Sequence, residues 1–327
     1  MRGGLPFVVV LLAVVAAASA YGGEVGTSAL WTVRDDGSNR QLLTALPAGT
    51  VLDRAANRVA LRTDDGLVIS APDGSGRVLL ADTKGVGDAA FSPSGRSIAY
   101  TSWANGSYGL YVAGSDGTGV RLVDAAASLA AWSPDESSIV FASGAEGARA
   151  DLVTELVDGS GRRVLVRRGV ADSAFRPSIS PDGRSIAYEC LNVRGGGFCI
   201  RRGRTIARYP GSGVDPLWSP TGRAIAATVA GNYNSGLDVT DLATHARRVI
   251  APIPKLIGVD FTPLAWSPNG RQLLYQRTCA GLRPPQCVTA VYNHTIATGK
   301  DRRVSTDGLR WTLAHWHGHT IGYVTQP

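Results

Sequence analysis

A repeated motif constrains the fold of this chain more than any other feature. An eleven-residue block containing a Ser-Pro pair, a tight turn and an alternating apolar run occurs five times. The copies are AFSPSGRSIAY (90–100), AWSPDESSIVF (131–141), SISPDGRSIAY (178–188), LWSPTGRAIAA (217–227) and AWSPNGRQLLY (265–275). Their prolines recur at intervals of 39 to 48 residues. A period of this length predicts a chain built from stacked supersecondary units.

Each copy contains a turn between two strands. An apolar residue ends one strand, Ser-Pro-x-Gly turns the chain, and the alternating run starts the next strand. A second signature follows 10 to 20 residues later, with an Asp-Gly turn between two β-like runs. It occurs as LWTVRDDGSNRQLL (30–43), LVISAPDGSGRVLL (67–80), LYVAGSDGTGVRLV (110–123) and LVTELVDGSGRRVL (152–165). Each unit is therefore predicted to be a four-stranded antiparallel meander.

Stacked four-stranded units predict an all-β fold, a single β-propeller. Seven units of about 44 residues account for the chain after residue 20, if degenerate copies at 53–62 and 315–324 are included. Segment 309–324 supplies the first two strands of a unit and segment 29–46 the last two, so their pairing would close the ring and remove open edges. We predict seven blades, with six as the alternative if the first copy is too distorted.

The first twenty residues resemble a targeting segment. Arg2 is followed by an apolar run over 6–17, and Ala18-Ser19-Ala20 fits the rule for signal-peptide cleavage. We therefore predict a signal peptide over 1–20 and a propeller domain over 21–327. The alternative is an uncleaved N-terminal anchor. Export would place the protein in the periplasm, on the cell wall or outside the cell.

The four cysteines agree with export. Cys190 and Cys199 flank one Gly-rich segment, and Cys279 and Cys287 flank one Pro-bearing segment. An even number of cysteines in an exported chain favours disulfides, and the spacing is too wide for the Cys-x₂₋₄-Cys pairs of zinc sites. We predict the bridges Cys190–Cys199 and Cys279–Cys287.

The motif x-W-S-P-D-G-R-x-I-A-Y followed by a D-G-S-G turn resembles the TolB-like propeller family. Segments 131–141, 178–188 and 265–275 match it best, and the resemblance covers roughly 28–327. It implies the propeller fold with greater force than any function. TolB itself is a periplasmic protein with an α/β domain before its propeller, where it meets envelope partners and imported toxins. Here the first blade signature begins about ten residues past the predicted signal, which leaves no space for that domain.

Residues that recur with the repeat are given structural roles. The aspartates of the Asp-Gly signature suit turn formation and lack calcium-loop spacing; they are Asp36, Asp73, Asp116 and Asp158. The tryptophans at the strand ends are expected to pack between blades; they are Trp132, Trp218, Trp266 and Trp316. The chain contains no G-x-S-x-G nucleophile motif and no phosphate-binding G-x-x-x-x-G-K-[ST] loop. No catalytic residue and no cofactor are therefore assigned.

One cluster lies outside the repeat signatures. His315, His317 and His319 alternate along the chain, and alternate residues of a strand share a face, so they could hold zinc or copper. The alignment instead places His317 and His319 in a shortened turn, where the alternation fails. We expect a polar turn here, with a metal site as the alternative.

Two classes of function remain open. A chain filled with repeats and free of catalytic motifs favours a non-enzymatic, monomeric scaffold that binds an envelope or extracellular protein or glycan. The alternative is an enzyme that acts at a propeller face, a metal-assisted lyase or hydrolase on a polymer. Nucleic-acid binding is not expected, because the net charge of +7 comes from arginines scattered along the chain.

Overall fold

Twenty-eight strands form seven four-stranded antiparallel sheets. The computed structural model describes residues 28–326 apart from 47–48, 56, 81–84, 105–106, 145–149, 168–172, 192–196, 211–213, 231–233, 281, 283–286 and 306–309. The predicted signal peptide lies outside these residues. The described part contains no helix that could cross a bilayer.

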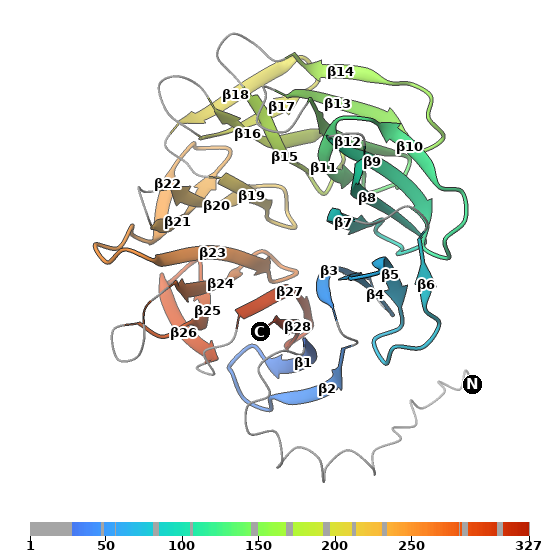
Figure 1. Cartoon of the computed structure of the whole chain (residues 1–327). Helices are drawn as coiled ribbons and strands as arrows, with labels where there is room; N and C mark the ends of the chain where they lie inside the picture. The colour runs from blue at the N-terminus through green and yellow to red at the C-terminus, as the bar shows by residue number, and fades with distance from the viewer. Residues whose placement is uncertain are drawn as a thin grey trace, which may run out of the picture.

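The seven sheets are the blades of a ring (Figure 1). Six of them follow the chain order, from the channel outward. The first two blades consist of β3(Thr50–Ala55), β4(Arg58–Thr63), β5(Gly66–Ser70) and β6(Val78–Leu79), and of β7(Val86–Phe91), β8(Ser97–Ala104), β9(Ser107–Gly114) and β10(Arg121–Asp124). The next two consist of β11(Ala127–Trp132), β12(Ser138–Ser143), β13(Asp151–Leu156) and β14(Arg163–Val166), and of β15(Ser173–Ile179), β16(Ser185–Leu191), β17(Gly197–Arg202) and β18(Thr205–Pro210). The last two of the six consist of β19(Val214–Trp218), β20(Ala224–Ala230), β21(Ser235–Asp241) and β22(Arg247–Ala251), and of β23(Val259–Trp266), β24(Gln272–Cys279), β25(Ala290–Thr295) and β26(Lys300–Ser305).

The seventh blade joins the two ends of the chain. Its order is β27(Arg310–His317), β28(Thr320–Gln326), β1(Ala29–Arg34) and β2(Gln41–Ala45). Strands β28 and β1 pair along six residues, from Ala29 opposite Thr325 to Arg34 opposite Thr320. The prediction that the ends close the ring is confirmed, as is the count of seven blades.

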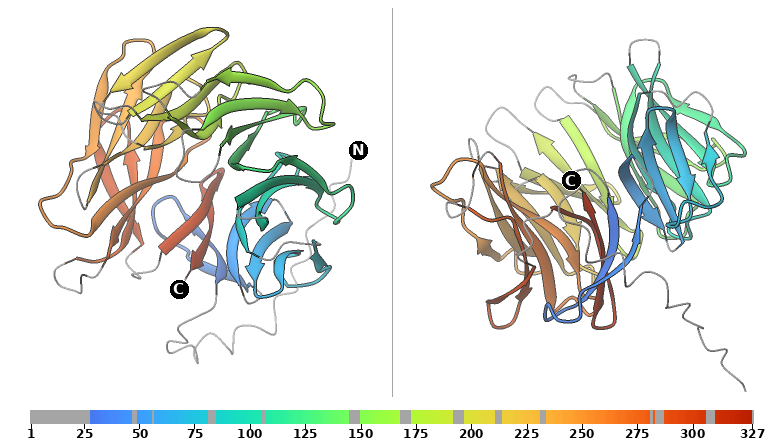
Figure 2. Two further views of the ribbon diagram at one scale, coloured as in Figure 1. Left: turned by 45° about the horizontal axis from the view of Figure 1, so that its top comes forward. Right: turned by 60° about the horizontal axis from the view of Figure 1, so that its bottom comes forward.

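The two faces of the ring are built differently (Figure 2). The connections from first to second strand and from third to fourth strand lie on one face, which we call the turn face. Five of the seven first-to-second connections on it are five residues long. The second-to-third connections lie on the opposite face, and their lengths range from two residues at 64–65 to ten at 280–289. The repeat therefore fixes one face of the ring and leaves the other free to vary.

The Ser-Pro motif forms the turns that the sequence predicts. In the first copy, Ser92 accepts a hydrogen bond from the backbone N–H of Gly95, which has a φ of 72°. A glycine adopts this left-handed conformation without a Cβ clash. In the second copy Glu136 occupies the same position, and its carboxylate accepts hydrogen bonds from the hydroxyl groups of Ser92 and Ser94 in the neighbouring blade.

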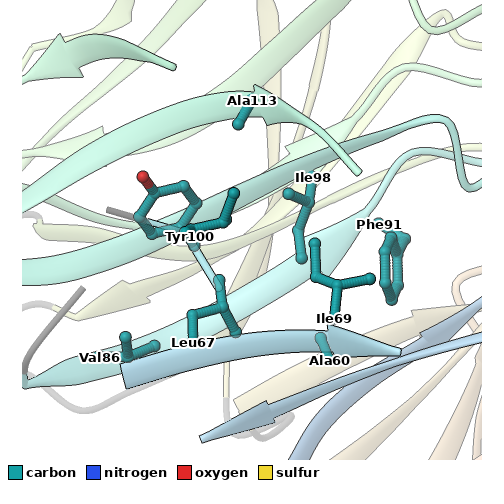
Figure 3. Packing of buried hydrophobic residues seen from close by; sticks show 9 residues of the cluster. Ala60, Leu67, Ile69, Val86, Phe91, Ile98, Tyr100 and Ala113 are labelled. Atoms are coloured by element: carbon teal, nitrogen blue, oxygen red, sulfur yellow. The ribbon is translucent and has the colours of Figure 1, made fainter. Parts of the chain in front are cut away.

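Apolar side chains fill the seams, meaning the interfaces between neighbouring blades. Figure 3 shows one such cluster, in which Leu67 and Ile69 of β5 pack against Ile98 and Tyr100 of β8. Indole N–H groups add one hydrogen bond across several seams. Trp132, Trp218 and Trp266 each donate to a carbonyl of the preceding blade, at 3.0 to 3.2 Å. The expected packing of these tryptophans between blades is confirmed.

Candidate functional site

Two of the three clustered histidines contact different partners. Nε2 of His315 lies 2.9 Å from the Arg54 guanidinium, and Nδ1 of His319 lies 2.9 Å from the Asp35 carboxylate. Burial, followed by the charge of Arg54, lowers the pKa of His315, so its Nε2 is unprotonated near neutral pH and accepts the guanidinium N–H. Across the described ranges, no three His, Cys, Asp or Glu side chains gather as metal ligands. The hydrogen bonds of His315 and His319 tie strands together, while nothing in the contacts gives His317 a role.

Both cysteine pairs are bridged in the structure. Cys190 and Cys199 connect β16 to β17 with their Cα atoms 5.7 Å apart. Cys279 and Cys287 close the ten-residue connection after β24, with Cα atoms 5.9 Å apart. Both bridges lie towards the face opposite the turn face.

A charged cluster joins two neighbouring blades near their first strands. Arg176 of β15 forms ion pairs with Asp215 of β19 and, at 3.6 Å, with Glu189 of β16. Burial raises the pKa of Glu189, which also accepts the backbone N–H of Asp215 at 3.1 Å. Arg176 and Asp215 both have left-handed backbones, with φ of 46° and 56°. The cluster's opposite charges are directed at one another, so it links the bulged first strands of two neighbouring blades.

One position on the outermost strands recurs in all seven blades beside the turn face. In each blade it pairs with an equivalent residue of the third strand, so the register identifies it without ambiguity. Four blades carry arginine there, which we call the seam arginines; they are Arg121, Arg163, Arg248 and Arg302. The matching residues of the other three blades are Gln41, Val78 and Ala207.

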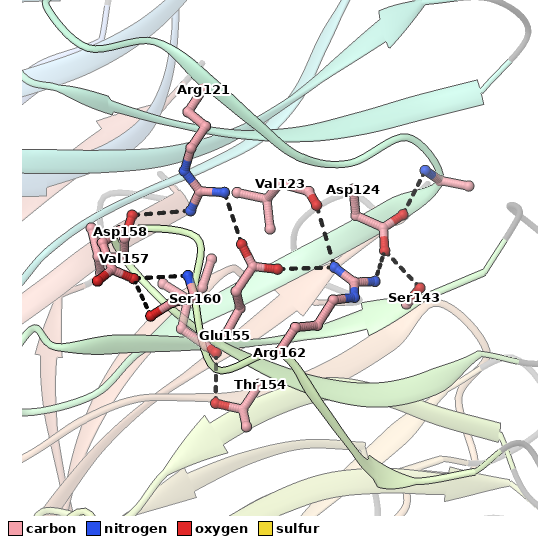
Figure 4. Close-up of polar contacts among 12 residues, drawn as sticks. Arg121, Val123, Asp124, Ser143, Thr154, Glu155, Val157, Asp158, Ser160 and Arg162 are labelled. Atoms are coloured by element: carbon pink, nitrogen blue, oxygen red, sulfur yellow. Dashed lines mark hydrogen bonds and ion pairs between the residues drawn. The ribbon is translucent and has the colours of Figure 1, made fainter.

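Arg121 shows what a seam arginine does (Figure 4). From β10 it reaches into the next blade, where Nη1 lies 2.8 Å from the Glu155 carboxylate and Nη2 donates to the Val157 carbonyl at 3.0 Å. Arg248 likewise donates to the carbonyl of Ile296 in the blade that follows it. In both seams the guanidinium covers the apolar interior with hydrogen bonds to the neighbouring blade.

The seam between blades β15–β18 and β19–β22 lacks this cover and contains a cleft. Ala207, opposite Ile200, occupies the position of the seam arginines. The cleft has a volume of about 670 Å³ and opens on the turn face. Its apolar lining consists of Pro181, Ile200, Ala207, Tyr209, Trp218, Pro220, Gly222 and Leu242. Its polar lining consists of Ser180, Asp182, Ser185, Arg202, Thr205 and Thr221.

The large buried side chains of the lining are apolar. Ile200, Tyr209 and Trp218 are each less than 10% exposed and form the floor. The Tyr209 ring is stacked between those of Phe198 and His245, so its position is fixed. Arg202, Thr205 and Thr221 are exposed at the rim. An apolar floor with a polar rim is typical of a site that binds the apolar part of a ligand and orients its polar part.

The fold is that of solved propellers, although no family model and no curated protein sequence matches the chain. A structure from Agrobacterium tumefaciens described as a TolB has a TM-score of 0.51 at 15% identity, over 92% of this chain and 99% of that one. Oligogalacturonate lyase from Vibrio parahaemolyticus has a TM-score of 0.57 at 12% identity, covering 78% and 82%. A puromycin hydrolase has a TM-score of 0.58 at 13% identity, covering 90% of this chain and 56% of the hydrolase.

The chain therefore shares the β-propeller fold with a TolB structure. At these identities the likeness extends to the fold and not to the activity, since proteins with different functions share it. The candidate site is therefore identified from the places where this propeller departs from its own repeat.

Sequence reasoning missed the cleft. The Asp-Gly signature that marks the third-to-fourth turn of four blades is absent from the blade β15–β18, where the turn is Arg202-Gly203-Arg204-Thr205. Ala207 could therefore not be aligned with the seam arginines from the sequence. A comparison of the residues that follow each turn would have provided a signal, if the strand register had been known.

Proposed function

We propose that this TolB-like propeller is an exported, non-enzymatic binding module that holds a ligand or partner segment in the cleft between blades β15–β18 and β19–β22. The observation that carries the proposal is the substitution of Ala207 for a seam arginine, which leaves an apolar floor accessible from the turn face. This seam lacks the stabilising contacts that Arg121 and Arg248 make in their seams. A binding site requires such an accessible apolar surface.

Export supports the same proposal. The two disulfides suit an oxidising compartment, and segment 1–20 has the composition of a signal peptide. We expect the secreted protein to begin at Tyr21, to be monomeric and to contain no free thiol. The intact mass of protein recovered from the medium or the periplasm tests the start and the bridges together, and four free thiols would contradict the expectation.

Photo-crosslinking in the exporting cell tests the binding site. A photoreactive p-benzoylphenylalanine at Thr205, on the rim of the cleft, should form a defined adduct that mass spectrometry can identify. The matched control is Gln41, which lies on the outermost strand of another blade at the position equivalent to Ala207. Adducts from Thr205 that disappear when Ala207→Arg is added support the proposal. Equal adducts from Thr205 and Gln41, or none from Thr205, would overturn it.

A further inference from the structure

The covered seams show which chemical group fits the open one. Arg121 and Arg248 each lay an aliphatic stem along a seam and donate to a backbone carbonyl of the next blade. The accepting residues, Val157 and Ile296, have equivalent places just after the third strand of their blades. Each donates its own N–H to the first-to-second turn of the same blade, at 3.0 Å.

The open seam keeps the accepting half of this arrangement. Leu242 follows β21 as Val157 follows β13, and its N–H donates to the Arg223 carbonyl at 2.9 Å. Leu242 also lines the cleft. Among the contacts of the described residues, none provides a donor for the Leu242 carbonyl. Where Arg121 and Arg248 supply a guanidinium to the covered seams, Ala207 supplies a methyl group.

The surroundings of this carbonyl suit a cation on an apolar stem. Ile200, Ala207 and Leu242 offer aliphatic surface for methylene groups. Asp182 lies at the rim, and a hydrogen bond from the Ser180 hydroxyl holds the pKa of its carboxyl below the ordinary value, so it is an anion at neutral pH. Arg202 is also at the rim. The positive charge of Arg202 repels a bound cation. Binding therefore depends on how well the N–H donors of the cation are placed against the Leu242 carbonyl.

We propose that the cleft binds the guanidinium of an arginine side chain from a partner polypeptide, with its stem against Ala207 and an N–H directed at the Leu242 carbonyl. The inference rests on the proposed function, because it names the group that the cleft holds. A lysine has the charge without the planar set of donors, and citrulline has the shape without the charge. In the covered seams the guanidinium belongs to the chain itself, and in the open seam the arginine of the partner supplies it.

The test uses the secreted protein and three peptides that differ in one residue, acetyl-Ala-Ala-X-Ala-Ala-amide with X as arginine, lysine or citrulline. The indole N–H signal of Trp218, assigned by its loss in Trp218→Phe, reports on the floor of the cleft by NMR. We expect saturable shifts with the arginine peptide, and binding at least about tenfold weaker with the other two, since charge-assisted hydrogen bonds to a fixed acceptor are lost or misplaced.

Two variants test whether the site is the cleft. Ala207→Arg supplies the missing guanidinium from within the chain and should abolish the response. Ala207→Leu fills the cleft without a cation and should also abolish it, so the test stands if the first variant folds poorly. Arg163→Ala, at the equivalent position of the preceding blade, should leave binding unchanged.

The outcomes separate this inference from the proposed function. A cleft-dependent adduct from Thr205 without any response to the arginine peptide overturns the guanidinium inference and leaves the binding module intact. Equal responses to arginine and citrulline, or to arginine and lysine, overturn it as well. The absence of both the adduct and the response overturns both.

Discussion

Replacement of Glu155 provides a quantitative test of how the seams are held. Glu155 lies on β13, with a side chain that is 4% exposed. Its carboxylate receives Arg121 from the preceding blade at 2.8 Å and Arg162 from its own blade at 3.1 Å. Arg162 continues to Asp124, so one buried anion connects two cations and two blades (Figure 4).

The expected cost follows from the burial of each partner. Removing one member of a fully buried ion pair costs about 3–5 kcal/mol, because the remaining charge is left without a partner. Here the side chains of Arg121 and Arg162 are 31% and 42% exposed, so water solvates them in part after the change. We therefore expect Glu155→Ala to lower the free energy of unfolding by about 2–3 kcal/mol. Glu155→Gln keeps one acceptor and should cost less, about 1–2 kcal/mol.

The assay is urea unfolding at neutral pH, followed by far-ultraviolet circular dichroism. Arg163→Ala is the matched control, because Arg163 has the same strand position as Arg121, is exposed and has no carboxylate partner in the described part of the chain. It should change the stability by less than about 0.5 kcal/mol. A double-mutant cycle between Arg121→Ala and Glu155→Ala should give a coupling of about 1–2 kcal/mol. A Glu155→Ala cost no larger than that of the control, or a cycle without coupling, would refute the account of the seam.

Two further predictions concern pH and redox state. Burial raises the pKa of Asp53 to about 6, above the 3.8 of the unfolded state, so the folded state binds the proton more tightly and stability falls as the pH rises from 4 through 6. Asp53→Asn, whose amide oxygen can still accept the Phe91 N–H, should gain up to about 3 kcal/mol over the wild type between pH 4 and pH 7. Unfolding of both proteins at each pH measures this, and parallel profiles would contradict it. Replacing Cys190 and Cys199 by serine should cost about 2.5 kcal/mol, as the chain entropy of a nine-residue loop predicts; the same urea assay checks it, and a loss below about 1 kcal/mol would show that the bridge adds little.

The sequence predicted the ring because the information for it is local. In the Ser-Pro-x-Gly turn the proline fixes a negative φ and the glycine tolerates a positive one, and Gly95 adopts the positive φ that the turn requires. Turns of this kind fix the strand order, and a regular period then fixes the number of blades. The closure by β28 and β1 followed from counting strands at the two ends.

The cleft could not be predicted because it depends on register. Arg121 and Arg163 both follow the aspartate of an Asp-Gly turn by five residues, so their equivalence is visible in the sequence. The pairing of β9 with β10 and of β13 with β14 also contains a register shift, whereas that of β17 with β18 contains none. A two-residue turn and a ladder without a register shift therefore place Ala207 at the arginine position. No local sequence pattern predicts this placement.

The departure at Ala207 is informative because the repeat supplies its own control. The seams that Arg121 and Arg248 cover each gain hydrogen bonds between a guanidinium and the next blade, worth about 1–3 kcal/mol in sum. The blade β15–β18 gives up that gain while retaining the Leu242 carbonyl that would accept the bond. The seam at Ala207 thus keeps an acceptor like those that Arg121 and Arg248 bond in their seams and lacks the donor, and this difference is the reason to seek a function there.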